Sequence, residues 1–175
     1  MDVLTDDISY DLEAVGLRRR GRRVGSNSSL AEEVNAFSRP AGVVLDSANN
    51  RALVTDNRLD ALVAVNLTTG ARTIVSNSST PDAVNAFSNP FGVVLDSPNN
   101  RALVTDYSLG ALVAVDLTTG ARTIVSNSSL PDAVNAFSGP YGVVLDSANN
   151  RALVTDNGLD ALVAVDVTTG ARTMV

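Results

Sequence analysis

The 175-residue sequence lacks five residue types altogether: Cys, His, Lys, Trp and Gln. Without Cys it can form no disulfide and no zinc–thiolate site, and it has no thiolate nucleophile. Without His it lacks the commonest general base and the commonest ligand of transition metals. Without Lys it has no Schiff-base amine and no P-loop lysine. Chemistry is left to carboxylates, hydroxyls, amides and Arg, which favour oxygen-ligated calcium over any other metal.

Charge and hydropathy argue against two classes of partner. The formal net charge is −6, whereas binding to nucleic acid phosphates needs a basic surface, so we expect no nucleic acid partner. No apolar run approaches the roughly 18 residues that a membrane span needs. The hydrophobic content of 45% is ordinary for a globular chain and allows one domain with a core.

A 50-residue repeat organises the chain. Residues 26–75, 76–125 and 126–175 align without a gap, and any two of these copies differ at nine to eleven positions. Residues 1–25 match the second half of the same unit, with Thr5 and Asp6 in the places of Thr55 and Asp56. The sequence therefore predicts a single repeat domain of three full copies preceded by a degenerate half copy.

Each full copy predicts four short strands, in the first copy over residues 42–46, 51–56, 61–67 and 72–75. Val, Leu, Ile and Thr dominate these segments, and turn-forming residues at 46–50, 56–58 and 68–70 separate them. The segment 61–67, ALVAVNL, is apolar on both faces, as in a strand that lies between two layers. Four-stranded antiparallel units of this length are typical of β-propeller blades, so the predicted fold class is all-β.

The segments PFGVVLDSPNNRALVTD and ALVAVDLTTGARTIVS resemble the YWTD and NHL repeats of six-bladed β-propellers of the TolB-like and SMP-30-like superfamily. LVTD stands where YWTD would, with Leu and Val in place of the aromatic pair. These propellers include receptors, scaffolds, lactonases and lyases, so the resemblance implies the fold and leaves the activity open. They are often exported, which implies a periplasmic or extracellular location, although Met1 does not open a signal peptide.

The copies differ mainly on one side of the expected propeller. The link 76–90 and the turn 57–60, with their equivalents, share one face, which we call the variable face. The turns 46–50 and 68–71 share the opposite, constant face. Nine of the 13 positions that differ among the copies lie on the variable face, against one on the constant face, at residue 48.

We therefore predict a binding surface on the variable face, for a protein, a glycan or a small ligand. Its candidate residues flank the proline before the innermost strand or occupy the adjacent turn: Arg39, Ala41, Asn89, Phe91, Gly139, Tyr141, Arg58, Tyr107 and Asp160. The alternative is that these positions simply tolerate change after a duplication.

Three further groups of residues recur with the repeat. Asp56, Asp106 and Asp156 match the YWTD aspartate, whose role in that family is mainly structural, and they are also weak candidates for calcium ligands. Asp46 and its equivalents are expected to accept local backbone N–H groups in tight turns. Phe37, Phe87 and Phe137 are expected to fill the long link between blades.

The sequence favours a non-enzymatic binding module that needs no cofactor. The alternative is a calcium-dependent, lactonase-like hydrolase or lyase, against which the missing His counts.

The count of strands predicts an open arc. The half copy has no innermost strand and the last copy ends on an outermost strand, so the termini cannot close the ring by exchanging strands. We expect an arc of about four blades, the first incomplete, with apolar faces such as ALVAVDV at 161–167 left exposed. A homo-oligomer or further blades would cover these faces.

Overall fold

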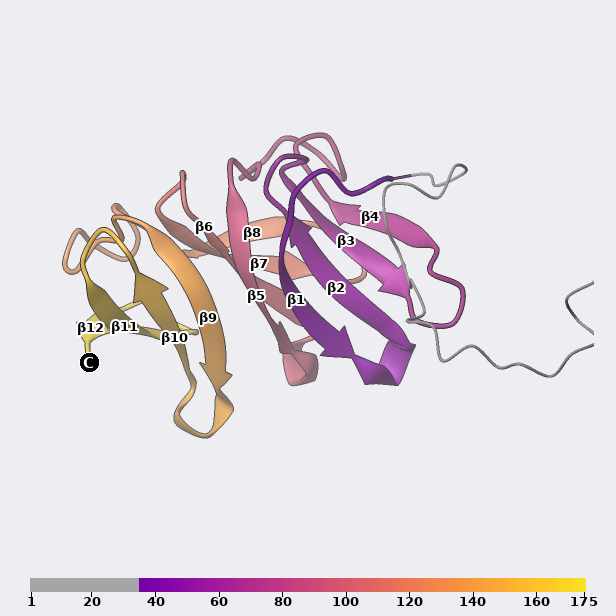
Figure 1. The fold of residues 1–175 in the computed structure, drawn as a ribbon. Coiled ribbons are helices and arrows are strands. Elements are labelled where there is room, and N and C mark those ends of the chain that lie inside the picture. Colours follow the sequence, from indigo (N-terminus) through magenta and orange to yellow (C-terminus); the bar gives the residue numbers. More distant parts are fainter. Residues whose placement is uncertain (1–34) are drawn as a thin grey trace, which may run out of the picture.

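The computed structural model describes residues 35–175, and the predicted half copy 1–25 lies outside the described residues. The described chain forms three four-stranded antiparallel sheets, one from each repeat, which we call blades 1, 2 and 3 (Figure 1). Blade 1 comprises β1 (Pro40–Asp46), β2 (Arg51–Asp56), β3 (Ala61–Asn66) and β4 (Arg72–Ser76); blade 2 comprises β5 (Pro90–Asp96), β6 (Arg101–Asp106), β7 (Ala111–Asp116) and β8 (Arg122–Ser126); blade 3 comprises β9 (Pro140–Asp146), β10 (Arg151–Asp156), β11 (Ala161–Asp166) and β12 (Arg172–Met174). The 3-10 turns η1 (Ser47–Asn49), η2 (Ser97–Asn99) and η3 (Ser147–Asn149) join the first two strands of each blade.

The predicted strands are confirmed with small differences at their ends: β1 begins two residues earlier, β3 ends one residue earlier and β4 ends one residue later than predicted. The innermost strand of blade 1 begins at Pro40, and an irregularity in the pairing separates Pro40 from Val43. Proline is tolerated there because the start of a strand need not donate to the ladder. Asn50 closes the following turn in the left-handed region, at φ 49°, which Asn adopts more readily than most residues.

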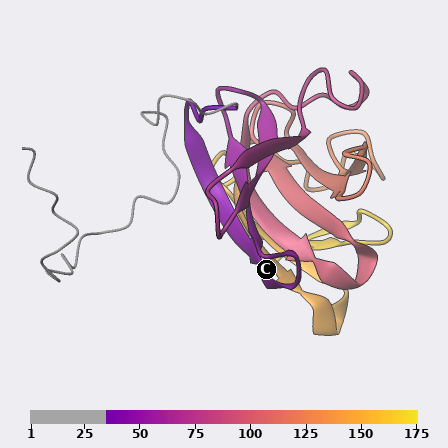
Figure 2. The same cartoon turned by 90° about the vertical axis from the view of Figure 1, so that its right-hand side faces the viewer.

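The blades stack face to face in an open arc, with β1, β5 and β9 side by side along its inner edge (Figure 1, and Figure 2 from the side). Leu53 and Leu62 of blade 1 share one fully buried cluster with Val104 and Val113 of blade 2. The equivalent side chains of blades 2 and 3 form a second cluster. The segment that is apolar on both faces, β3, is buried from Ala61 to Val65, as predicted.

Polar contacts repeat at each blade boundary. Thr55 Oγ1 accepts the N–H of Gly42 (2.8 Å) and donates to the carbonyl of Phe91 in the next blade (2.5 Å). A Cβ on Gly42 would lie 2.3 Å from that carbonyl oxygen, so only glycine allows the approach. At the outer edge, Ser76 Oγ donates to the carbonyl of Gly120 (2.8 Å). Thr105, Gly92 and Ser126 make the same contacts between blades 2 and 3.

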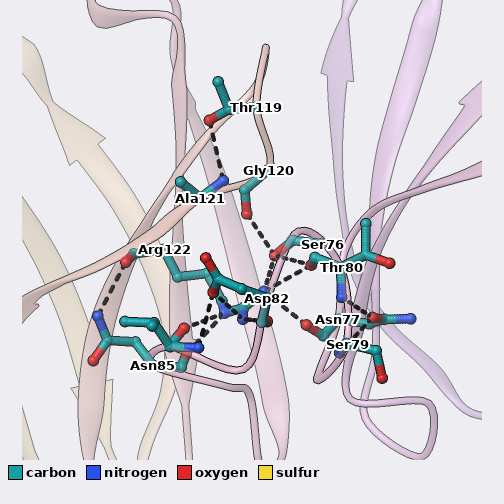
Figure 3. Close-up of polar contacts among 11 residues, drawn as sticks. Ser76, Asn77, Ser79, Thr80, Asp82, Asn85, Thr119, Gly120, Ala121 and Arg122 are labelled. Carbon is teal, nitrogen blue, oxygen red and sulfur yellow. Dashed lines mark hydrogen bonds and ion pairs between the residues drawn. The ribbon is translucent and has the colours of Figure 1, made fainter.

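A buried arginine organises each described long link. The side chain of Arg122 has no exposed surface, and burial lowers its pKa while Asp82 opposes that effect. Its guanidinium donates to Ser76 Oγ and to the carbonyls of Asn77, Thr80, Asp82, Val84 and Asn85 (Figure 3). It also lies 5.8 Å from the centre of the buried Phe87 ring, which confirms that this ring fills the link. Arg172 repeats the arrangement in the next link, around Phe137.

The expectation of an open arc is confirmed for the described blades, since no sheet closes the ring. Val43 and Leu45 at one end and Val144 at the other are exposed. Within residues 161–167 the predicted exposure is partial, since Ala161 and Leu162 are partly exposed whereas Val163 and Val165 are buried. Within residues 35–175, no helix has the length and apolarity that crossing a bilayer requires.

Candidate functional site

An aspartate at the end of the second strand holds the variable face together in each blade. The carboxylate of the buried Asp56 accepts the backbone N–H groups of Ser38 (2.7 Å), Arg39 (2.9 Å), Arg58 (3.1 Å) and Leu59 (3.0 Å). It therefore ties the end of the long link to the β2–β3 turn. Asp106 and Asp156 bind the equivalent loops. These contacts account for a structural role of all three aspartates.

An aromatic cluster lies at the rim of the variable face. The Phe91 ring stacks on Tyr141 of the next blade, with ring centres 4.4 Å apart and an angle of 29° between the planes. Tyr107 meets the edge of Phe91 at 6.0 Å. Tyr141 and Tyr107 are 44% and 40% exposed, which is unusual for large rings that are already in contact. The cluster therefore offers two accessible rings on a fixed base.

Two neighbouring candidates support the position of Tyr107. The carbonyl of Asn89 accepts the Tyr107 N–H at 3.0 Å. A Cβ on Gly139 would lie 3.0 Å from Tyr107 Cε2, so the absence of a side chain there leaves room for the ring. The structure thus brings together five of the nine predicted site residues, namely Asn89, Phe91, Tyr107, Gly139 and Tyr141.

The other four candidates lie apart from the rings. Arg39, Ala41 and Arg58 are exposed on blade 1, where position 41 carries no aromatic ring, and Asp160 is exposed on the β10–β11 turn. Asp60 holds the turn position of Asp160 in blade 1 and is partly buried. Burial and the nearby carboxylates of Asp106 and Asp56 raise the pKa of Asp60. Carboxylates of blades 1 and 2 therefore lie close to one another at this boundary.

The described residues contain no group of three or more carboxylate, His or Cys side chains that could hold a metal ion. The oxygens of Asp56 are also occupied by backbone N–H groups, as described above. Calcium ligation by Asp56, Asp106 or Asp156 stays a prediction of the alternative function.

Two grooves on the constant face were not anticipated from the sequence. The first, of about 550 Å³, lies between blades 1 and 2 and is lined by polar residues that include Asn49, Arg51, Thr69 and Thr118. An equivalent groove of about 570 Å³ lies between blades 2 and 3. The signal was present in the sequence, since these positions carry nearly the same residues in all copies. Such constancy also fits turn formation, which is the role predicted for Asp46 and its equivalents.

The Asp46 turn borders the first of these grooves. Its carboxylate accepts side-chain N–H groups from Arg51 (2.7 Å) and Asn49 (2.9 Å), in addition to the predicted local backbone N–H, which Asn49 supplies. Burial by itself would raise the pKa of Asp46, but the bonds from Arg51 and Asn49 outweigh it and lower that pKa. Arg51 is thereby held in place at the groove.

No protein-family model and no curated protein matches the sequence. Solved structures do match it. A chain in the crystal structure of the nidogen/laminin complex superposes with a TM-score of 0.66 at 17% identity, over 80% of this chain and 49% of that chain. Virginiamycin B lyase from Staphylococcus aureus gives 0.58 at 17% identity, over 80% and 42%. Kuenenia stuttgartiensis hydrazine synthase gives 0.60 at 11% identity, over 83% and 37%.

These likenesses confirm the fold. The described residues form three blades of a β-propeller, with repeats similar to those of YWTD-type propellers, and the chain spans less than half the length of the matched chains. The matched structures include a complex between two proteins and a lyase. The fold therefore does not by itself separate a binding module from an enzyme.

Proposed function

We propose that the chain is a non-enzymatic binding module that contacts a protein or a glycan through the variable face. The observation that carries this proposal is the exposed cluster of Phe91, Tyr107 and Tyr141 at the rim of that face. Tyrosine offers an apolar ring and a hydroxyl at low entropic cost, and tyrosines are enriched where proteins bind other molecules. The likeness to a chain in the nidogen/laminin complex supports a protein partner.

The chemistry around the rings fits a mixed polar and apolar partner. Stacking on Tyr141 and Tyr107 would supply the apolar contact, for a sugar ring or for an aromatic or aliphatic side chain. Arg39 and Arg58 on blade 1 would bind carboxylate or hydroxyl groups through their planar forks. Because the aspartates clamp both loops to the blades, the surface would need little ordering on binding.

Tyrosine fluorescence offers a direct test, because the chain has three Tyr and no Trp. The probes are an array of purified glycans and a laminin fragment, with each response titrated to obtain a dissociation constant. Phe91→Ala combined with Tyr141→Ala should weaken binding by more than about 2 kcal/mol, or roughly 30-fold. The far-UV circular dichroism of this variant should match that of the unaltered protein.

The matched control lies on the constant face. Ser47→Ala combined with Thr69→Ala should leave the dissociation constant unchanged, because these residues are on the opposite side of the blades. An equal loss in this control would place the ligand in the constant-face grooves and contradict the proposal.

The calcium-dependent hydrolase or lyase is the second candidate, and the likeness to virginiamycin B lyase is the observation that favours it. It would need calcium held by aspartate or asparagine oxygens around the channel. A calcium ion bound there would stabilise the folded state against heat.

A further inference from the structure

The two end faces of the described arc correspond to the two sides of the contact that joins consecutive blades within the chain. We infer that blade 1 of a second copy of this chain docks on blade 3, and that two copies close a ring of six described blades. This inference does not depend on the proposed function.

The outer face of blade 3 lacks a contact that blades 1 and 2 both make. Thr55 and Thr105 are fully buried, and each donates to a carbonyl of the following blade. Thr155 is exposed, and its hydroxyl oxygen accepts the N–H of Gly142 at 2.9 Å. Val144, on the innermost strand of the same face, is 58% exposed.

The first face of blade 1 exposes apolar side chains whose counterparts in later blades are buried. They lie on its inner strand and on its constant-face turn. Val43 is 68% exposed, whereas Val93 at the same position of blade 2 is 7% exposed. Leu67 is 50% exposed, whereas its counterpart Val167 is 7% exposed. Positions in near-identical repeats differ in exposure because blades 2 and 3 each have a described blade before them.

On blade 3 the described residues form one wall of a third groove, without a facing wall from a following blade. Asn149, Arg151 and Thr173 line a hollow of about 390 Å³, compared with 550 and 570 Å³ for the two complete grooves. In the first groove the second wall consists of residues 117–120 of the next blade. Residues 67–70 of a second copy occupy the same repeat positions and would complete the groove on blade 3.

The repeat itself identifies the occupant. Within the chain, the outer face of one blade meets the first face of the following blade twice, between blades 1 and 2 and between blades 2 and 3. The surfaces that meet have nearly the same sequence at both boundaries. Blade 1 of a second copy presents that first face again. When blade 1 of the second copy docks on blade 3 of the first, blade 3 of the second copy and blade 1 of the first remain. These two faces make the same contact, so a ring with two-fold symmetry closes both ends.

The contacts at the rim of the variable face agree with a ring of two copies. Closure would place Ala41 of the second copy beside Tyr141, at the position that Tyr141 itself holds beside Phe91. The rim of the variable face would then be continuous.

Sedimentation equilibrium of the full chain tests this inference. The unaltered protein should have the mass of two chains. Val144→Asp should give the mass of one chain, because Val44 and Val93, the equivalent pair inside the chain, pack in one apolar cluster. Adding Val43→Arg to that variant should shift the mass back toward two chains, since each interface would then hold an Arg and an Asp.

A steric variant and a matched control accompany these changes. Gly142→Ala should also separate the two copies, because a Cβ at the equivalent Gly42 or Gly92 would lie 2.3 or 2.5 Å from a carbonyl of the next blade. Val134→Asp should not, although Val134 is as exposed as Val144, because Val134 lies in the link before blade 3. Circular dichroism should show the same strand signal in all variants.

Three results would overturn the inference. One is a one-chain mass for the unaltered protein at every concentration, which would follow if the predicted half copy at residues 1–25, rather than a second copy, covered the first face of blade 1. Another is a mass that keeps growing with concentration, which would mean that arcs join without closing. The third is a double variant no more dimeric than Val144→Asp, which would refute the pairing of these two faces.

Discussion

At the scale of single residues, the long links depend on Arg122 and Arg172. A link of this length has few apolar side chains and many backbone carbonyls that must be satisfied near the protein interior. One planar guanidinium with five N–H donors meets several of them at once, which an ammonium cannot do in the same fork geometry. Phe87 and Phe137 supply the apolar surface beneath each guanidinium.

Arg122→Ala should lower the free energy of unfolding by about 3 kcal/mol, because it removes a buried side chain and leaves several part-buried carbonyls of the link without their donor. Arg122→Lys should recover only a small part of the loss. Urea unfolding monitored by circular dichroism would measure both.

Arg58→Ala serves as the control, since Arg58 is exposed, and its cost should stay below about 0.5 kcal/mol. Equal losses at the two arginines would show that Arg122 does not organise the link.

At the scale of elements, each blade is stabilised through its neighbours rather than alone. A four-stranded sheet that is apolar on both faces must cover both, and the contact between blades does so through Leu53, Leu62 and their equivalents. The threonine–carbonyl and serine–carbonyl bonds set the register of one blade on the next. Repeat arrays of this kind unfold cooperatively only while the contacts between neighbouring repeats remain strong.

Gly92→Ala should weaken the boundary between blades 2 and 3 by about 2 kcal/mol, because its Cβ would lie 2.5 Å from the carbonyl oxygen of Tyr141. The urea transition should also become broader as the blades uncouple.

Gly142→Ala is the paired comparison for Gly92→Ala. Within one chain a Cβ there would meet only Thr155 Oγ1, at 3.0 Å, so its effect should be small when measured at a concentration where the protein has the mass of one chain. A similar loss at both glycines would contradict the assigned role of the boundary contact.

At the scale of the whole molecule, the described arc exposes apolar side chains at both ends, and the chain carries a net charge of −6. Covering the apolar ends and neutralising part of the negative charge would each stabilise the folded protein. A bound calcium ion would neutralise part of this negative charge. It would also supply the metal that the hydrolase or lyase alternative requires. An ion that binds only the folded state raises the melting temperature, and the rise grows with the logarithm of its concentration relative to its dissociation constant.

For the proposed binding module, we expect the same melting temperature in millimolar calcium as in EDTA, measured by differential scanning calorimetry. Magnesium at the same concentration controls for general screening of charge. A rise of several degrees with calcium alone would support the hydrolase or lyase and count against the proposed function.

The sequence by itself determined the blades. Their strands follow from local causes, namely β-branched residues between turns of Asn, Asp, Ser and Gly, repeated every 50 residues, and the structure confirms them to within two residues at β1. It also placed Phe87 and Phe137 in the links and the candidate rim positions on one face. The half copy at residues 1–25 lies outside the described residues, so its predicted strands stay a prediction.

The tertiary structure alone decided which residues meet across the blades. Arg122 contacts residues about 40 positions earlier, and Phe91 stacks on a ring 50 positions later, so no local pattern predicts either contact. The exposure of Val43 and Val144 is likewise invisible in the sequence, because nearly identical copies carry the same residues at both buried and open boundaries. Local propensities set the strands, whereas these contacts and exposures depend on how one blade sits against the next.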